Sequence, residues 1–201
     1  MKTPLLLSAL VLIAACSQEP DAAPAPTTLH NVMLTEVDAN ADALWDVTNA
    51  AIGDEGGLDP AKLDDAHWLK IAELADKVAA GANKIAAMDP IVAAPPGTNI
   101  GDSNVPGGHS AAQVQTAIDV DPEGLRSLAK SLGMHMSDIA AAARAHDAVT
   151  AGPLVDALDG VCESCHLRYW YPEQAEAVKQ FQDSGVVDPN HPGFGPVEPA
   201  K

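Results

Sequence analysis

The 201-residue sequence predicts an all-α fold, an antiparallel up-down-up-down bundle of four helices. Its composition is rich in alanine and leucine and only 3% aromatic, and alanine and leucine lose little side-chain freedom in a helix. No run of alternating Val, Ile, Thr or Tyr indicates a β-strand. Four stretches carry apolar residues at helical spacing, with two short connections and one long one between them, as in a bundle of this kind.

A signal peptide is predicted over residues 1–15, ahead of the fold. Lys2 precedes the apolar run LLLSALVLIAA at 5–15, which is too short to span a bilayer as a mature helix. The sequence IAAC at 13–16 resembles the lipobox of bacterial lipoproteins, in which the chain is cut before the cysteine and the thiol carries diacylglycerol. The alternative is an ordinary signal peptide that is cut after Ala15.

The lipobox resemblance implies that Cys16 is lipidated and that the protein contacts a bacterial membrane, on its periplasmic side, through a lipid anchor only. Several acyl chains anchor a protein firmly, whereas a single chain binds only marginally. In lipoproteins a serine after the cysteine, here Ser17, usually accompanies the outer membrane, so that membrane is favoured. Residues 16–28 are rich in Pro and Ala and are expected to form a flexible tether.

The first two helices of the predicted bundle follow this tether. The first covers residues 29–52 and ends at a group of glycines. Its apolar stripe is Leu29, Met33, Val37, Leu44 and Ala51, with Trp45 beside it. The second begins at Asp59-Pro60, a capping residue followed by a first-turn proline, and ends before Pro90. Its stripe is Leu63, His67, Ile71, Leu74, Val78, Ala82 and Ile85.

A long connection at 90–120 separates the two halves of the bundle, whose domain is predicted over residues 29–171. The connection is rich in Gly and Pro at first and offers a weak helical piece at 111–118. Connections of this length are usually either functional or disordered.

The third helix opens at Asp121-Pro122, and its apolar steps alternate between three and four residues, as at a bundle seam. Its stripe is Leu125, Leu128, Leu132, His135, Ile139, Ala142, His146 and Val149. Gly152-Pro153 is expected to break the chain before the fourth helix, residues 153–169. The inward residues of that helix are Leu154, Leu158, Val161, Cys165 and Tyr169. A short helix near 173–183 and an irregular tail account for residues 172–201.

The motif CESCH at 162–166 is the clearest chemical signal in the chain. A zinc ribbon needs a second pair of ligands, which the chain does not supply as cysteines. A thioredoxin-like dithiol needs a βαβ setting, and none is predicted. Attachment of haem requires CxxCH in an exported protein, and both conditions are met. Because Cys162, Cys165 and His166 share one helix face, each thiol can add to a haem vinyl group while the imidazole binds the iron. The motif therefore predicts one covalent haem c.

The position of this motif on the last of four helices, before Arg168-Tyr169-Trp170-Tyr171, resembles the cytochrome c′ family of class II c-type cytochromes. The stretch NVMLTEVDANADALWD resembles the opening helix of that family, and DDAHWLKIAELADKVAAGANKIA is similar to its second helix. The resemblance covers about residues 29–90 and 121–171, whereas the connection at 90–120 and the tail at 172–201 depart from the compact family form.

The ligand on the second face of the iron is expected from the helix ends that lie beside the end of the fourth helix. His30, Met33, Met88, His109 and His191 are the candidates at this level. Met33 lies on the inward stripe, where relatives with a six-coordinate iron carry a methionine. His166 and Met33 are therefore the predicted iron ligands, and His30, His109 or an open position are the alternatives. His67, His135 and His146 lie further away and are expected at helix seams, although His67 and His146 share one end of the bundle and offer an alternative metal site.

Haem suggests an electron carrier and no enzyme activity, because Met/His ligation raises the reduction potential and suits electron transfer. The alternative is a five-coordinate haem module that binds a small gas such as NO or CO. A peroxidase-like site would need a distal histidine with an arginine nearby, and nothing in the sequence places His109 and Arg126 together in this way.

The formal net charge of −17 becomes about one unit more negative once residues 1–15, with their single lysine, are removed. Such a surface repels nucleic acid and should prefer a redox partner protein with a basic patch. The family resemblance also implies that a homodimer can form, because cytochromes c′ often dimerise through their first two helices.

Overall fold

The computed structural model describes residues 27–54 and 56–183, and their regular structure is helical. A first segment joins α1 (Leu29–Val32), the π-helical η1 (Met33–Asp38) and α2 (Ala39–Asn49). Three longer helices follow it: α3 (Asp65–Ala86), α5 (Pro122–Arg144) and α6 (Ala148–Tyr169). The part of the chain that is described contains no β-strand, only an isolated bridge between Ile52 and Leu58. The predicted all-α class is therefore confirmed.

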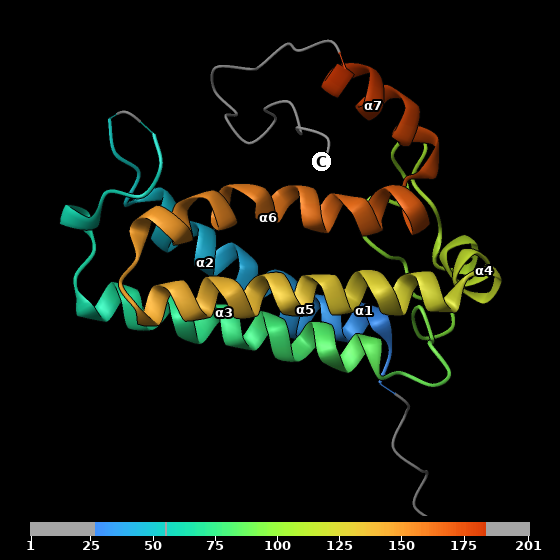
Figure 1. Ribbon diagram of the computed structural model, residues 1–201. Helices are drawn as coiled ribbons and strands as arrows, with labels where there is room; N and C mark the ends of the chain where they lie inside the picture. The colour runs from blue at the N-terminus through green and yellow to red at the C-terminus, as the bar shows by residue number, and fades with distance from the viewer. Residues whose placement is uncertain (1–26, 55, 184–201) are drawn as a thin grey trace, which may run out of the picture.

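The long helices lie side by side, as Figure 1 shows. α3 packs against α5 and against the first segment, and α6 packs against α5. Leu44, Ile71, Ile139 and Leu158, one from each long segment, are completely buried in the common core. The shorter helices are η2 (Pro60–Lys62), α4 (Ala111–Val120), η3 (Pro172–Gln174) and α7 (Ala175–Asp183).

The π-helical turns of η1 set the face that the first segment presents to α6. In a regular α-helix with 3.6 residues per turn, positions four apart drift around the axis by about 40° per step. The wider π-helical turn, with its i→i+5 bonds, offsets part of this drift. Side chains also bond backbone carbonyls in this region: the Thr35 hydroxyl donates to the Asn31 carbonyl at 2.7 Å, and the Asn40 amide donates to the Glu36 carbonyl at 2.9 Å. Positions four apart therefore stay on one face: Leu29, Met33, Val37, Ala41 and Trp45.

The break between the third and fourth helices was predicted at Gly152-Pro153, and this is wrong. α5 ends at Arg144, and α6 begins at Ala148. The Asp147 side chain accepts hydrogen bonds from the Thr150 backbone N–H at 3.1 Å and from its hydroxyl at 2.6 Å, which caps α6. Pro153 lies within the second turn, where it removes a single helical hydrogen bond close to the helix start. Val149 is consequently 86% exposed and does not belong to the α5 stripe.

The long connection between α3 and α5 contains a complete helix in place of the weak helical piece that was expected. α4 begins at a capping box in which Ser110 and Gln113 bond each other's backbone N–H groups. Val114 and Ile118 fasten this helix to the core. The boundary of the predicted tether also shifts, since Thr28 is buried and caps α1.

The predicted signal peptide at 1–15, Cys16, most of the tether and the tail beyond residue 183 lie outside the described residues. Among the helices that are described, none has the length and apolar character needed to cross a membrane.

Candidate functional site

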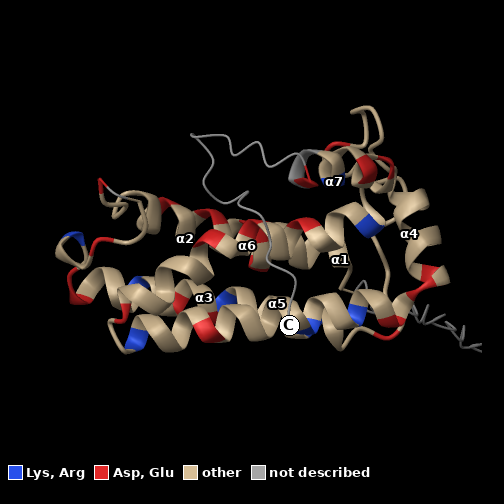
Figure 2. Ribbon diagram, turned by 45° about the horizontal axis from the view of Figure 1, so that its top comes forward, with Lys and Arg blue, Asp and Glu red and all other residues tan. Residues whose placement is uncertain are grey.

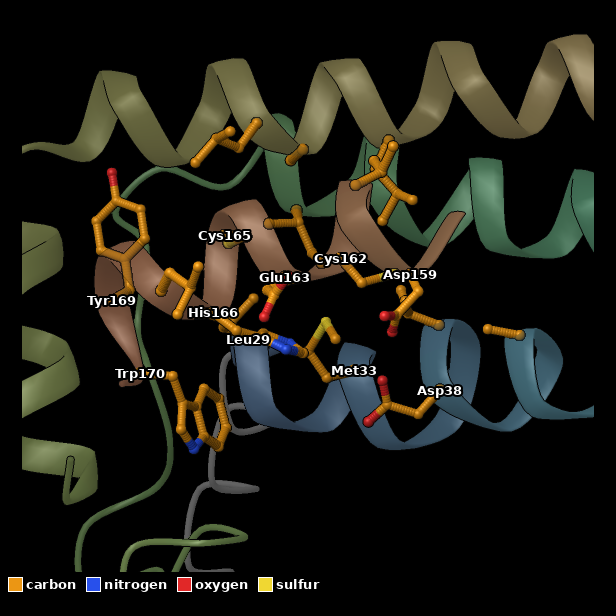
Figure 3. Close-up of a pocket in the computed structure, with 18 of the residues that line it drawn as sticks. Leu29, Met33, Asp38, Asp159, Cys162, Glu163, Cys165, His166, Tyr169 and Trp170 are labelled. Carbon is orange, nitrogen blue, oxygen red and sulfur yellow. The ribbon is translucent and has the colours of Figure 1, made fainter. Parts of the chain in front are cut away.

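A cavity of about 510 Å³ lies between the first segment, α5 and α6. Its wall contains Cys162, Cys165 and His166 from α6 and Met33 from η1, four of the site residues predicted from the sequence. Figure 3 shows that the side chains of His166 and Met33 point toward each other across the space between their helices. The fold therefore brings the CESCH motif and a thioether that is 133 positions away in the sequence into one site.

The two cysteines lie in the second half of α6, three positions apart, and both line the cavity. Burial raises the pKa of the Cys162 thiol to about 12, and nearby Asp159 adds to this effect. Burial likewise raises the pKa of the Cys165 thiol to about 11. Reactive dithiols have a depressed pKa and sit at helix N-termini or beside positive charges. This pair is therefore poorly suited to thiolate redox chemistry.

A zinc site is also disfavoured by the surroundings of the cysteines. Within residues 27–54 and 56–183, no three His, Cys, Asp or Glu side chains gather closely enough to hold a metal ion. Structural zinc in proteins takes four ligands of this kind. Among the described residues, Cys162, Cys165 and His166 thus have no arrangement that would supply the ligands of a zinc site.

His166 is half-buried near the C-terminal end of α6. Burial lowers its pKa, against the opposing charges of Asp159 and Asp102, so the imidazole is kept neutral at physiological pH. A neutral imidazole has a free nitrogen lone pair and can bind a metal. Two aromatic rings contact it, Trp170 and Tyr171, each with its centroid 6.0 Å from that of His166.

The remaining cavity wall is mostly apolar. Met33 is half-buried there, and no residue in the described part of the chain forms a hydrogen bond with its thioether. The apolar residues come from all the surrounding helices: Leu29, Val37, Ala41, Ile85, Val114, Leu125, Leu128, Ala129 and Leu132. An apolar wall of this kind suits a flat hydrophobic cofactor, and the volume falls within the range of about 300–1,000 Å³ that is typical of cofactor pockets.

Four carboxylates form one part of the cavity wall, and sequence analysis did not single them out. Asp38 and Asp42 lie one turn apart on the first segment, and Asp159 and Glu163 lie one turn apart on α6. Burial raises the pKa of Asp38, and Asp42 raises it further; burial and Asp159 raise the pKa of Glu163. The sequence does contain a signal for them. The two acids of each pair are four positions apart, which puts them on one helix face, and the pairs lie near Met33 and Cys162 in the sequence.

The cavity fits a haem on three counts. Its two thiols are spaced on one helix face, its imidazole is neutral and inward, and the thioether of Met33 lies on the opposite helix. The thiols and the imidazole are the groups that c-type attachment requires. Met/His is one of the axial ligand pairs that proteins use for haem iron.

The other candidates for the second iron ligand lie elsewhere. His30 does not line the cavity, and its backbone N–H donates to the Ala93 carbonyl at 2.9 Å. Met88 is buried in the core. His109 lines a separate hollow beside Arg168 and Tyr169, with its Nε2 3.9 Å from the Glu173 carboxylate. His191 lies outside the described residues.

Arg126 and His109 do not form a peroxidase-like pair. The Arg126 guanidinium donates to the Met88 carbonyl at 2.9 Å and to the Glu123 carboxylate at 2.5 Å. Neither Arg126 nor His109 lines the cavity.

The three histidines expected at helix seams divide into two groups. His135 lies at the seam, where its Nε2 is 2.8 Å from the Leu154 carbonyl of α6. His67 and His146 do not, because their side chains are 49% and 48% exposed. His67 bonds Asp64 in the cap of α3, and His146 stacks on Trp68 just beyond the end of α5.

The site thus combines two protonated thiols, one neutral imidazole and one thioether around a largely apolar space, and among the residues that line it these thiols are not activated as nucleophiles. Comparisons with protein families, with curated proteins and with solved structures find no match to this chain.

Proposed function

We propose that this protein is a c-type cytochrome of the bacterial cell envelope, a one-electron carrier built as an antiparallel four-helix bundle of the cytochrome c′ type. A single observation carries the proposal: Cys162, Cys165 and His166 from α6 and Met33 from η1 line the same cavity. A chance CxxCH on a helix surface would not be expected to face an apolar cavity with an axial ligand on its other side.

Each side chain has a separate role in this proposal. The Cys162 and Cys165 thiols would hold the haem covalently through its two vinyl groups, each S–H adding across one vinyl double bond. The neutral His166 imidazole and the Met33 thioether would hold its iron. Haem bound in this way supplies reversible one-electron chemistry at its iron.

The surroundings of the site support electron transfer more than catalysis. The apolar side chains of α5 and the first segment make up much of the wall of the site. Among the residues that the structure describes, Arg126 and His109 form no pair that faces the cavity, because both are held elsewhere. If His166 and Met33 both held the iron, no position on it would be left for a substrate.

The cellular setting in this proposal comes from the N-terminal sequence. A lipidated Cys16 holds the protein on the periplasmic side of a membrane, the outer membrane being favoured, and a flexible segment lets the domain reach membrane-bound redox partners. The acidic surface favours a partner with a basic patch.

Mass spectrometry tests haem attachment directly. The protein is expressed with the cytochrome c maturation system, digested, and the peptide that contains Cys162 and Cys165 is weighed. We expect a gain of one porphyrin on that peptide and its loss in a Cys162→Ser/Cys165→Ser double variant. Colourless protein whose peptide has only its own mass would overturn the proposal.

An optical spectrum tests the axial ligands. We expect the ferric protein to show the sulfur-to-iron charge-transfer band and the reduced protein to be unchanged by CO. High-spin bands and ready CO binding would instead assign the protein to the five-coordinate alternative, a haem module that binds a small gas.

A further inference from the structure

The long connection between α3 and α4 is fastened to the chain that follows α6. We call its residues 101–109 the 101–109 loop. The Trp170 indole N–H donates to the Gly101 carbonyl at 3.1 Å, and the Tyr171 hydroxyl donates to the Asp102 carboxylate at 3.0 Å. The His109 backbone N–H donates to the Trp170 carbonyl at 2.9 Å, and the Gln174 amide donates to the Pro106 carbonyl at 3.3 Å. The loop therefore folds over the end of α6.

The two side chains that the loop holds are the ones in contact with His166. The Trp170 ring is inclined by 54° to the imidazole and the Tyr171 ring by 78°, with both centroids 6.0 Å away. The backbone N–H groups of Trp170 and Tyr171 also donate to the His166 carbonyl, at 2.7 and 2.8 Å. Rings that approach the imidazole from two directions restrict its rotation.

Asp102 differs from the other non-glycine residues of the loop in its left-handed backbone conformation and in its carboxylate, which binds Tyr171. Its φ of 54° lies in the left-handed region, which aspartate adopts more readily than most residues. The Tyr171 phenol is the donor in the bond that the Asp102 carboxylate accepts. The Asp102 carboxylate also acts on the His166 imidazole through its negative charge.

We propose that the 101–109 loop positions the proximal ligand: Gly101 and Asp102 fix Trp170 and Tyr171, and these rings fix the plane of the His166 imidazole. The inference rests on the proposed function, because His166 needs a fixed plane only as an iron ligand. It gives the long connection at 90–120 a role in setting the ligand field and the reduction potential.

Two substitutions separate the hydrogen bond from the charge. Asp102→Asn removes the negative charge but keeps an oxygen that can accept the Tyr171 hydroxyl, whereas Tyr171→Phe removes the hydroxyl and keeps the charge. We expect Asp102→Asn to raise the reduction potential, because a nearby negative charge favours the oxidised iron. We expect Tyr171→Phe to broaden the low-spin electron paramagnetic resonance signal of the ferric protein, because the imidazole then samples several planes.

Asp138→Asn is the matched control, since Asp138 is exposed on α5 and does not line the cavity. It removes the same charge as Asp102→Asn and should leave both the signal and the potential close to those of the parent protein. The porphyrin mass on the Cys162 peptide is measured in every variant. Absence of that mass in the parent protein would overturn the proposed function. Haem-loaded Asp102→Asn and Tyr171→Phe proteins indistinguishable from the control would overturn the positioning role alone.

A measurement on the unaltered protein guards against variants that fail to fold. Nuclear magnetic resonance follows hydrogen exchange at the indole N–H of Trp170 in the haem-loaded protein. The bond to Gly101 predicts protection. Exchange as fast as that of a free indole would contradict the positioning role.

Discussion

Met33 is the residue on which the proposed choice between electron transfer and gas binding depends. Its side chain enters the cavity from η1, opposite His166. We expect Met33→Ala to abolish the sulfur-to-iron band, to lower the reduction potential and to allow CO to bind the reduced protein, because methionine ligation raises the potential and fills the sixth position. Optical spectroscopy with a redox titration measures all three.

Met134→Ala is the control for this change, because Met134 is 63% exposed on the outer side of α5. Its spectrum should match that of the parent protein. If Met33→Ala also kept the parent spectrum, Met33 would be a packing residue, a common role for methionine in cores.

Asp38 gives a prediction about the dependence of stability on pH. Burial and the neighbouring Asp42 raise its pKa above the ordinary value of 3.8. The folded protein therefore holds this proton more tightly than the unfolded chain, and stability is lost as the pH rises through the raised pKa. We expect Asp38→Asn to increase the free energy of unfolding of the haem-free protein at neutral pH, with the gain vanishing below the ordinary value. Urea titrations over a range of pH measure this change.

In the same titrations, Asp64→Asn should decrease the free energy of unfolding at neutral pH, the opposite of Asp38→Asn. Hydrogen bonds from His67 lower the pKa of Asp64, so its contribution to stability is present at neutral pH and disappears as the pH falls through the lowered pKa. Asparagine keeps a capping oxygen on α3. If both variants changed the free energy of unfolding equally at every pH, the raised pKa of Asp38 and the lowered pKa of Asp64 would both be contradicted.

At the scale of the helices, Gly81 allows α3 to approach the π-helical segment. A Cβ atom at this position would lie 3.0 Å from Val37 and 3.1 Å from Glu36. We expect Gly81→Ala to destabilise the protein, since overpacking costs about 1–3 kcal/mol and the gain in helix propensity is only about 1 kcal/mol. Chemical denaturation measures the difference.

Gly160→Ala is the matched control inside α6, where a Cβ atom would meet nothing within 4 Å. This change should stabilise the protein by up to about 1 kcal/mol through helix propensity alone. Stabilisation by both substitutions would show that α3 and η1 are not packed as closely as their backbones indicate.

The helices could be predicted from the sequence where local signals agree with the packing. Asp121-Pro122 caps α5 as expected, and Cys162, Cys165 and His166 lie on one face because they are spaced three and four residues apart in a helix. The exact start of α6 could not be predicted in this way. Gly152-Pro153 is a strong breaker locally, but the Asp147 cap and the buried Ala151 favour starting the helix earlier.

Contacts between distant segments could not be predicted from local signals at all. The π-helical turn at Met33–Asp38 has no sequence signature, and only the four-residue spacing of Met33, Val37 and Ala41 hints at it. The contacts of the 101–109 loop with Trp170 and Tyr171 depend on residues 69 positions apart. Such pairings depend on tertiary packing, which local sequence signals do not specify.

At the scale of the whole molecule, acidic and basic side chains are distributed unevenly: the first segment and α6 are acidic, whereas α3 and α5 carry both kinds. The first segment carries Glu36, Asp38, Asp42 and Asp46 and no lysine or arginine. α6 carries Asp156, Asp159 and Glu163 against a single Arg168. Figure 2 shows basic residues on α3 and α5, where they alternate with acidic ones. The first segment and α6, which flank the cavity from opposite sides, thus make part of its wall acidic. Under the proposed function we expect a basic redox partner to dock at this acidic part.

This asymmetry predicts how the haem-loaded protein exchanges electrons with a small basic redox protein. Because charges are screened beyond about 10 Å at 0.1 M salt, the association rate should fall as salt is added, and steering of this kind changes rates by about 10-fold to 1,000-fold. Asp42→Asn/Asp159→Asn should lower the rate and weaken its salt dependence more than Asp119→Asn/Asp138→Asn, which removes two charges from α4 and α5. Stopped-flow kinetics at several salt concentrations gives, for each double variant, the slope of the rate against salt concentration. Equal slopes for the two double variants would mean that net charge attracts the partner and that the cavity side has no special part in docking.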